Sequence, residues 1–118
     1  MPLSERARVE VYLPDSPRTT YQDLLVTLTR EFTYTFGGCT TIGGLDGSYL
    51  SHAGMHVQDR ISLIYTDTPY AFEANFGIIS TYAEKLRVAA FAALEEDSML
   101  VAVIKIYHAE RDITSRIF

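Results

Sequence analysis

The chain has 118 residues, of which 47% are hydrophobic and 21% are charged, and this composition is typical of an ordinary globular domain. Its formal net charge is −5, and no cluster of lysine or arginine supplies the basic surface on which nucleic-acid binding depends, so we expect no nucleic-acid partner. A single cysteine excludes an internal disulfide framework and favours a cytoplasmic location.

The sequence also lacks the long apolar segments that mark membrane proteins. No stretch approaches the roughly 18 apolar residues that a membrane span needs, and residues 1–10 contain no apolar region of a signal peptide. We therefore expect no membrane partner. The length is close to the commonest size of one domain, so we expect a single domain over residues 1–118.

The first third of the chain predicts a strand followed by a helix. Residues 6–13 alternate between apolar and polar side chains, which is the period-two pattern of a strand. A helix is expected to begin near Thr19 or Thr20, either of which could cap it, and to end at the glycine pair 37–38. Its buried stripe follows helical spacing and consists of Tyr21, Leu25, Leu28 and Phe32.

The middle of the chain predicts two further strands. Residues 39–51 favour a broken strand with a bulge at the glycine pair 43–44 and a tight turn at residues 46–47. A turn at residues 52–54 follows, and residues 57–67 alternate again as a strand. The glycines do not match a phosphate-binding loop, since a strand and not a helix follows them, and we expect no cofactor.

The last third predicts a helix and a final strand. Residues 75–96 place apolar side chains at helical spacing, and several alanines among them allow close packing on a sheet. Residues 99–107 are almost wholly apolar and are predicted to form the fourth strand, which leaves residues 108–118 as a mostly polar tail.

This order of elements predicts the ferredoxin-like β-α-β-β-α-β fold of the α+β class, an antiparallel four-stranded sheet with both helices on one face. We call the other face of the sheet the open face. It is expected to carry one set of alternating side chains, namely Arg8, Glu10, Tyr12, Ser62, Ile64, Val101, Val103, Lys105 and Tyr107. A strand exposed to water should alternate cleanly, yet Val101 and Val103 are apolar. A second copy covering the open face would explain them, so we expect a homo-oligomer, with a dimer as the commonest form.

In this order of elements the chain resembles the dimeric ferredoxin-like α+β-barrel proteins, a group that includes small enzymes and stress-response proteins. The resemblance covers most of the chain and implies an oligomer. The segment GGCTTIGGLDGSYLS, at residues 37–51, looks like a family signature, and we attach no function to it.

The chain also resembles the tautomerase superfamily in its length and order of elements. In that family, removal of Met1 exposes a proline, and a C-terminal tail contacts a neighbouring copy; here Pro2 follows Met1, and Ile117-Phe118 ends the tail. The resemblance implies that Pro2 is a general base, because a secondary amine in an apolar pocket can have a lowered pKa. The family's proline opens the first strand, whereas residues 3–5 intervene here. The alternative is a proline without a role at a loose terminus.

Two other groups of residues are candidate sites of chemistry. His52, His56 and Asp59 are residue types that bind metals, but His56 and Asp59 would point to opposite faces of an extended strand, so we expect exposed hairpin residues and no metal site. Cys39 follows the end of a helix, where no helix N-terminus lowers the pKa of a thiol, so a structural cysteine is the expected interpretation.

The predicted ligand site lies where the open face meets the glycine-rich segment, and it consists of Glu10, Tyr12, Tyr49, Lys105 and Tyr107. Tyrosines combine apolar area with a polar tip, and a pocket under a dimeric sheet suits an acidic or aromatic small molecule. The same residues could instead form a dimer interface with a satisfied ion pair.

Two functions follow from these patterns. The first is an oligomeric domain that binds a small molecule or a protein partner through the open face, and the alternative is an enzyme of the tautomerase kind that depends on Pro2. The sequence contains no convergent catalytic set that would decide between them.

Overall fold

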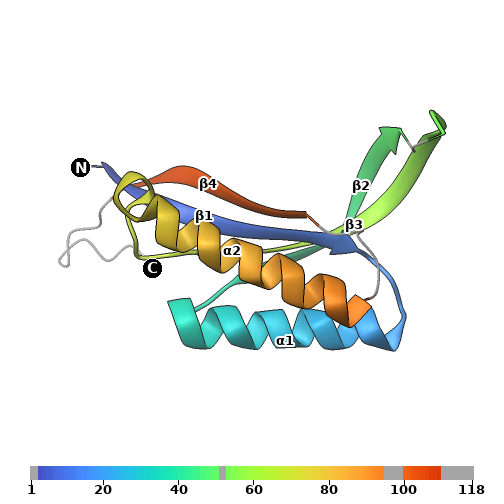
Figure 1. Ribbon diagram of the computed structural model, residues 1–118, viewed down its shortest axis with the longest axis horizontal. Helices are drawn as coiled ribbons and strands as arrows, with labels where there is room; N and C mark the ends of the chain where they lie inside the picture. Colours follow the sequence, from blue (N-terminus) through green and yellow to red (C-terminus); the bar gives the residue numbers. More distant parts are fainter. Residues whose placement is uncertain (1–2, 51–52, 95–99, 110–118) are drawn as a thin grey trace.

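The computed structural model describes residues 3–50, 53–94 and 100–109, with only the backbone of Tyr49. These residues form two layers, a sheet and a pair of helices (Figure 1). The elements, in chain order, are β1 (Leu3–Pro14), α1 (Thr19–Phe36), β2 (Thr40–Leu50), β3 (His56–Asp67), α2 (Phe72–Leu94) and β4 (Leu100–Ala109).

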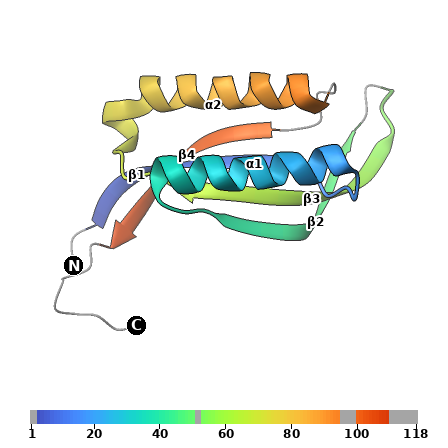
Figure 2. The same cartoon turned by 90° about the horizontal axis from the view of Figure 1, so that it is seen from below.

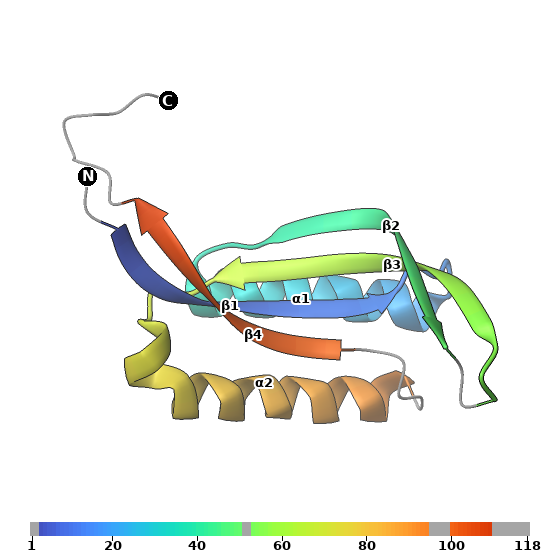
Figure 3. The ribbon, with the colours of Figure 1, turned by 90° about the horizontal axis from the view of Figure 1, so that it is seen from above.

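The four strands lie in the order β2-β3-β1-β4, and every neighbouring pair is antiparallel. Both helices cover one face of this sheet (Figure 2), and no described element covers the opposite, open face (Figure 3). The predicted ferredoxin-like β-α-β-β-α-β fold is therefore confirmed. The far ends of β2 and β3 extend beyond the helices as a hairpin (Figure 1).

The core lies between the sheet and the helices. Alternate residues of β1 point into it and are at most 2% exposed: Ala7, Val9, Val11 and Leu13. From α1 they meet Leu28 and Phe32, which belong to the predicted apolar stripe. Alternation on the strand and helical spacing on α1 thus bring the two apolar surfaces together, as expected.

The pairing of the strands corrects the predicted open face. Val11 pairs with Ile64 and Leu13 with Ser62, so both β3 residues share the helix-facing side of β1, and both are buried. The predicted place of Ser62 and Ile64 on the open face is wrong, because their neighbours Ile61, Leu63 and Tyr65 take it.

The same correction applies to β4. Val11 pairs with Val101, Val9 with Val103, Ala7 with Lys105 and Glu5 with Tyr107, which places all four β4 residues on the helix-facing side. Val101 and Val103 pack against the core there. Their predicted place on the open face is wrong, and Ala102, Ile104 and Ile106 lie on it instead.

Several local predictions also differ from the structure. Arg18, and neither threonine, is the N-cap of α1, and it makes no side-chain capping hydrogen bond. The second helix begins at Phe72, three residues before the predicted start. Asp46 and Gly47 do not form a tight turn, since they pair with Arg60 and Asp59 inside the β2–β3 ladder.

The glycine positions behave as predicted at two points. Gly37 ends α1 with a φ of 96°, and its backbone N–H donates to the Thr33 carbonyl at 2.9 Å. Gly44 has a φ of 69° within the register shift between Ile42 and Leu45, which is the expected bulge. Both conformations are left-handed and favour glycine.

Some predictions fall outside the described ranges. These are the roles of Pro2 and His52, the ends of the second helix and fourth strand near residues 95–99, and the tail that ends in Ile117-Phe118.

Candidate functional site

The open face carries apolar side chains on all four strands. They lie in line, through the strand pairing, with the residues of β1 that point away from the helices. They are Ile42, Leu45, Ile61, Leu63, Tyr65, Leu100, Ala102, Ile104 and Ile106. All of them are at least partly exposed in the single chain, with Leu100 at 59%. The predicted apolar character of the open face is therefore real, although it comes from other residues than those expected.

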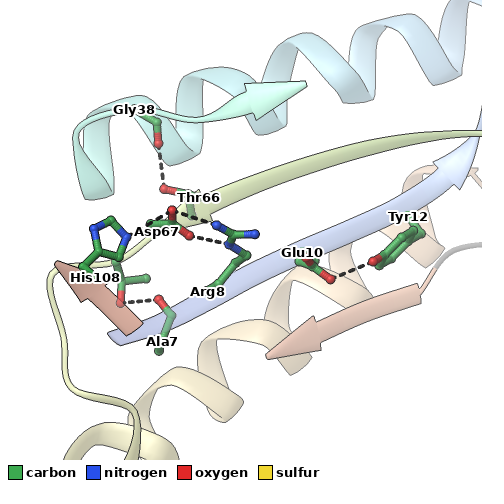
Figure 4. A network of polar contacts seen from close by, with 9 residues as sticks. Ala7, Arg8, Glu10, Tyr12, Gly38, Thr66, Asp67 and His108 are labelled. Atoms are coloured by element: carbon green, nitrogen blue, oxygen red, sulfur yellow. Dashed lines mark hydrogen bonds and ion pairs between the residues drawn. The ribbon is translucent and has the colours of Figure 1, made fainter. Parts of the chain in front are cut away.

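A charged cluster, which consists of Arg8, Asp67 and His108, interrupts the open face where β1, β3 and β4 meet (Figure 4). Arg8 donates two hydrogen bonds to Asp67, from Nε to Oδ1 at 2.5 Å and from Nη2 to Oδ2 at 3.1 Å. Its guanidinium also lies 4.2 Å from the centre of the Tyr65 ring. The hydrogen bond to Asp67 raises the pKa of Arg8 above its ordinary value, and His108 Nε2 lies 3.5 Å from Asp67 Oδ2.

Glu10 is the buried carboxylate of the open face. Only 8% of the residue is exposed, and its Oε1 accepts a hydrogen bond from the Tyr12 hydroxyl at 2.7 Å (Figure 4). This hydrogen bond, followed by burial, raises the pKa of Tyr12 above its ordinary value. The Tyr12 hydroxyl therefore keeps its proton at neutral pH and serves as the hydrogen-bond donor to Glu10.

The five predicted ligand residues do not converge on one site. Glu10 and Tyr12 lie together on the open face, as expected. Lys105 lies on the helix-facing side, where its Nζ bonds Glu73 at 2.8 Å, and Tyr107 shares that side. The backbone of Tyr49 pairs with Val57, six residues along β3 from the partner of Tyr12, which places it about 20 Å away on the hairpin.

The other candidate residues lie on the hairpin and at the end of α1. His56 Nε2 and Ser48 Oγ are 2.5 Å apart, and Asp59 is exposed and accepts a hydrogen bond from the Arg60 backbone. Across residues 3–50, 53–94 and 100–109, no cluster of three histidine, cysteine or acidic residues could hold a metal ion. Cys39 is half-buried, with its Sγ 3.8 Å from the Thr29 carbonyl.

A cavity of about 290 Å³ lies beside the charged cluster, at the loop that joins α1 to β2. We call it the loop pocket, and it is lined by Phe36, Gly37, Gly38, Cys39, Thr40, Tyr65 and Asp67. The loop is tied to β3, because the Thr66 hydroxyl donates to the Gly38 carbonyl at 2.6 Å (Figure 4). The loop pocket thus lies at the edge of the open face and shares Asp67 with the charged cluster.

Two larger hollows lie elsewhere. One, of about 550 Å³, is at the base of the hairpin and is lined by three aspartates, Asp15, Asp46 and Asp59, together with Arg60. The other, of about 430 Å³, runs between the two helices on the covered side of the sheet.

The sequence interpretation missed Asp67 and His108 as parts of the charged cluster. The signal was present, since Arg8 and Asp67 occupy outward positions of two strands that the fold places side by side. Register decides whether two such residues meet, and periodicity alone does not supply it.

In the described residues, no helix is both long and apolar enough to cross a membrane.

Comparison with known proteins identifies the fold. No protein-family model matches the chain, and no curated protein matches it. Among solved structures it is similar to CPII from Thiomonas intermedia K12, a nitrogen regulatory PII-like protein bound to ADP, AMP and bicarbonate, at 20% identity and a TM-score of 0.51 over 94% of this chain and 100% of that chain. The same protein bound to ADP, AMP and acetate gives 21% identity and a TM-score of 0.50 over 93% and 94%.

CutA1 from Oryza sativa is similar at 16% identity and a TM-score of 0.47, over 94% of this chain and 86% of its own. At these identities the likeness to CPII shows the fold alone. CPII gives no support to the tautomerase resemblance, which stays a prediction. The chain therefore has the ferredoxin-like α+β fold that CPII also has.

Proposed function

We propose that the chain is a single α+β domain that associates with identical copies through its open face and binds a small molecule beside that face. The observation that carries the proposal is the apolar surface that runs across all four strands of the open face. An antiparallel sheet that faces water carries polar side chains there. Leu63 and Ile104 occupy positions where polar residues would be expected.

An identical copy is the occupant that best fits this surface. Most soluble oligomers are built from identical chains around closed symmetry axes. The charged groups at the centre of the face already have partners in their own chain, since Arg8 holds Asp67 and Tyr12 bonds Glu10. Covering these paired groups costs less free energy than covering unpaired charges. A closed assembly is therefore proposed, and a dimer is its smallest form.

A charge on the open face tests the assembly. Leu63→Asp introduces a carboxylate between Tyr12 and Ile42, where an approaching copy would desolvate it. We expect light scattering to report a multiple of the 13.3 kDa chain for the wild type and a lower mass for this variant. Ile78→Asp is the matched control, because Ile78 is 72% exposed on α2 and should leave the mass unchanged. Equal masses for all three proteins would place the contact elsewhere.

We propose an adenine nucleotide as the small molecule and the loop pocket as part of its site. The ligand class comes from CPII, whose structures hold ADP and AMP. The loop pocket supports this choice because its lining includes Tyr65, an aromatic side chain over whose ring the Arg8 guanidinium lies. Its volume of about 290 Å³ lies at the low end for ligand sites, so the proposal requires the neighbouring copy to complete it.

Filling the loop pocket tests the ligand site. A Cβ added at Gly38 meets no atom within 4 Å, and its φ lies outside the left-handed region, so Gly38→Leu should fold normally while it blocks the pocket. Calorimetric titration with ADP and AMP is expected to show binding to the wild type and at least about tenfold weaker binding to the variant, which corresponds to about 1.4 kcal/mol. Gly77→Leu adds the same side chain in open space on α2 and should bind like the wild type. Equal affinity in both variants would contradict this site.

A further inference from the structure

The hollow between the two helices is an apolar groove with small side chains on one wall. Leu24 and Leu28 of α1 and Leu86 of α2 line it, together with Ala89, Ala90 and Ala93. The three alanines are short, which leaves a space of about 430 Å³ between antiparallel helices. This groove lies on the side of the molecule opposite to the open face (Figure 2), so an occupant there would not compete with a second copy on the sheet.

Side chains of the two helices close one end of the hollow. The Tyr82 hydroxyl of α2 donates to Glu31 Oε1 of α1 at 2.9 Å, and the Tyr82 ring packs edge-on against Phe36 of α1. The α1 residues that line the hollow run from Thr20 to Glu31, so the groove is about 16 Å long, or three helical turns.

Charge distinguishes this groove from an ordinary apolar surface. The residues that line the hollow include two acids, Asp23 and Glu31, and no lysine or arginine. Asp23 is exposed, and none of the described residues bonds its carboxylate. The rim is therefore negative and the floor is apolar, on a chain whose net charge is −5.

We propose that this groove binds the apolar face of a basic amphipathic helix from a partner protein. A helix of about three turns matches the length of the groove, and its apolar side chains at positions i, i+3, i+4 and i+7 would fill the space above the alanines. Lysine or arginine at its flanks would face Asp23 and Glu31, which selects against acidic helices. The interaction does not depend on the open face or on the loop pocket.

A pair of synthetic peptides tests the proposal on the whole chain. The probe is a fluorescein-labelled peptide of about 18 residues, with leucine and alanine on one helical face and lysine on the other. The control peptide has the same apolar face with glutamate in place of lysine. Fluorescence anisotropy is expected to show the lysine peptide binding at least about tenfold more tightly than the glutamate peptide.

Variants of exposed residues locate the binding. Ala93→Phe fills the groove, and Asp23→Lys reverses the charge of the rim; each is expected to weaken binding of the lysine peptide at least about fivefold. Asp46→Lys makes the same charge reversal on the hairpin and should bind like the wild type, which separates groove binding from general attraction to an acidic protein. Circular dichroism checks that each variant is folded.

Three outcomes would overturn the proposal: no binding of the lysine peptide, equal binding of the two peptides, or binding that Ala93→Phe and Asp23→Lys leave unchanged. A fourth is a lower mass of the assembled protein in Ala93→Phe, because the groove would then be a contact between copies. The three peptide results do not bear on the Leu63→Asp experiment, so the two proposals fail separately.

Discussion

Single residues set the conformation of the loop that borders the loop pocket. Gly37 and Gly38 are neighbours with different backbone states. Gly37 has a φ of 96°, which only glycine adopts without strain, whereas the φ of Gly38 lies outside the left-handed region. A Cβ would meet no atom within 4 Å at either position, so backbone conformation is the main difference between them.

Substituting the two glycines separates these effects. Gly37→Ala is expected to lower the free energy of unfolding by about 1 kcal/mol, because alanine is strained at a positive φ. Gly38→Ala should be neutral or slightly stabilising, since alanine reduces the freedom of the unfolded chain and adopts the folded conformation without strain. Urea unfolding of both variants measures the difference. Equal losses would contradict the structural explanation.

At the scale of elements, β1 contributes both to the core and to the start of α2. Besides carrying the core alternation, it caps α2, because Glu5 Oε1 accepts a hydrogen bond from the Glu73 backbone N–H at 2.6 Å. Glu73 in turn bonds Lys105 of β4. The N-terminus of α2 is thus held by side chains of the two strands that it crosses, and Phe72 begins the helix earlier than spacing predicted.

Removing this cap is expected to weaken α2. Glu5→Ala leaves the Glu73 N–H without its acceptor and should lower the free energy of unfolding by about 1 kcal/mol, as for other N-caps. Glu5→Gln keeps a carbonyl oxygen in place and should lose clearly less. Thermal unfolding followed by circular dichroism compares the two variants, and an identical loss in both would mean that the hydrogen bond does not stabilise the helix.

The strands also show what periodicity can and cannot predict. On β1 one alternating set is wholly apolar, from Ala7 to Leu13, so its direction follows from the sequence and was predicted correctly. On β4 both sets contain apolar residues, Val101 and Val103 on one side and Ile104 and Ile106 on the other. Only pairing with β1 decides which set meets the helices, and a shift of one residue exchanges the faces.

The prediction of the candidate site depended on the same choice between the two faces of a strand. Glu10 and Tyr12 were placed correctly because they belong to β1. Lys105 and Tyr107 were misplaced because they belong to β4. Asp67 and His108 were missed because their meeting with Arg8 depends on the register of three strands. The order of elements, which fixes the ferredoxin-like fold, did not depend on register and was predicted in full.

At the scale of the whole molecule, the two layers present two different surfaces. The sheet offers an apolar face whose central charges are already paired, which suits an identical copy. The helices offer an acidic-rimmed groove, which suits a basic helix. Because the two surfaces lie on opposite sides (Figures 2 and 3), an assembled protein would keep its grooves accessible.

The central claim is association through the open face, and the mass of the wild-type protein in solution tests it most directly. Sedimentation velocity of the unlabelled chain, from low to high micromolar concentration, measures this mass without any substitution. The account predicts a species that is a whole multiple of 13.3 kDa and that becomes more populated as concentration rises. A single species of 13.3 kDa at high micromolar concentration would contradict it.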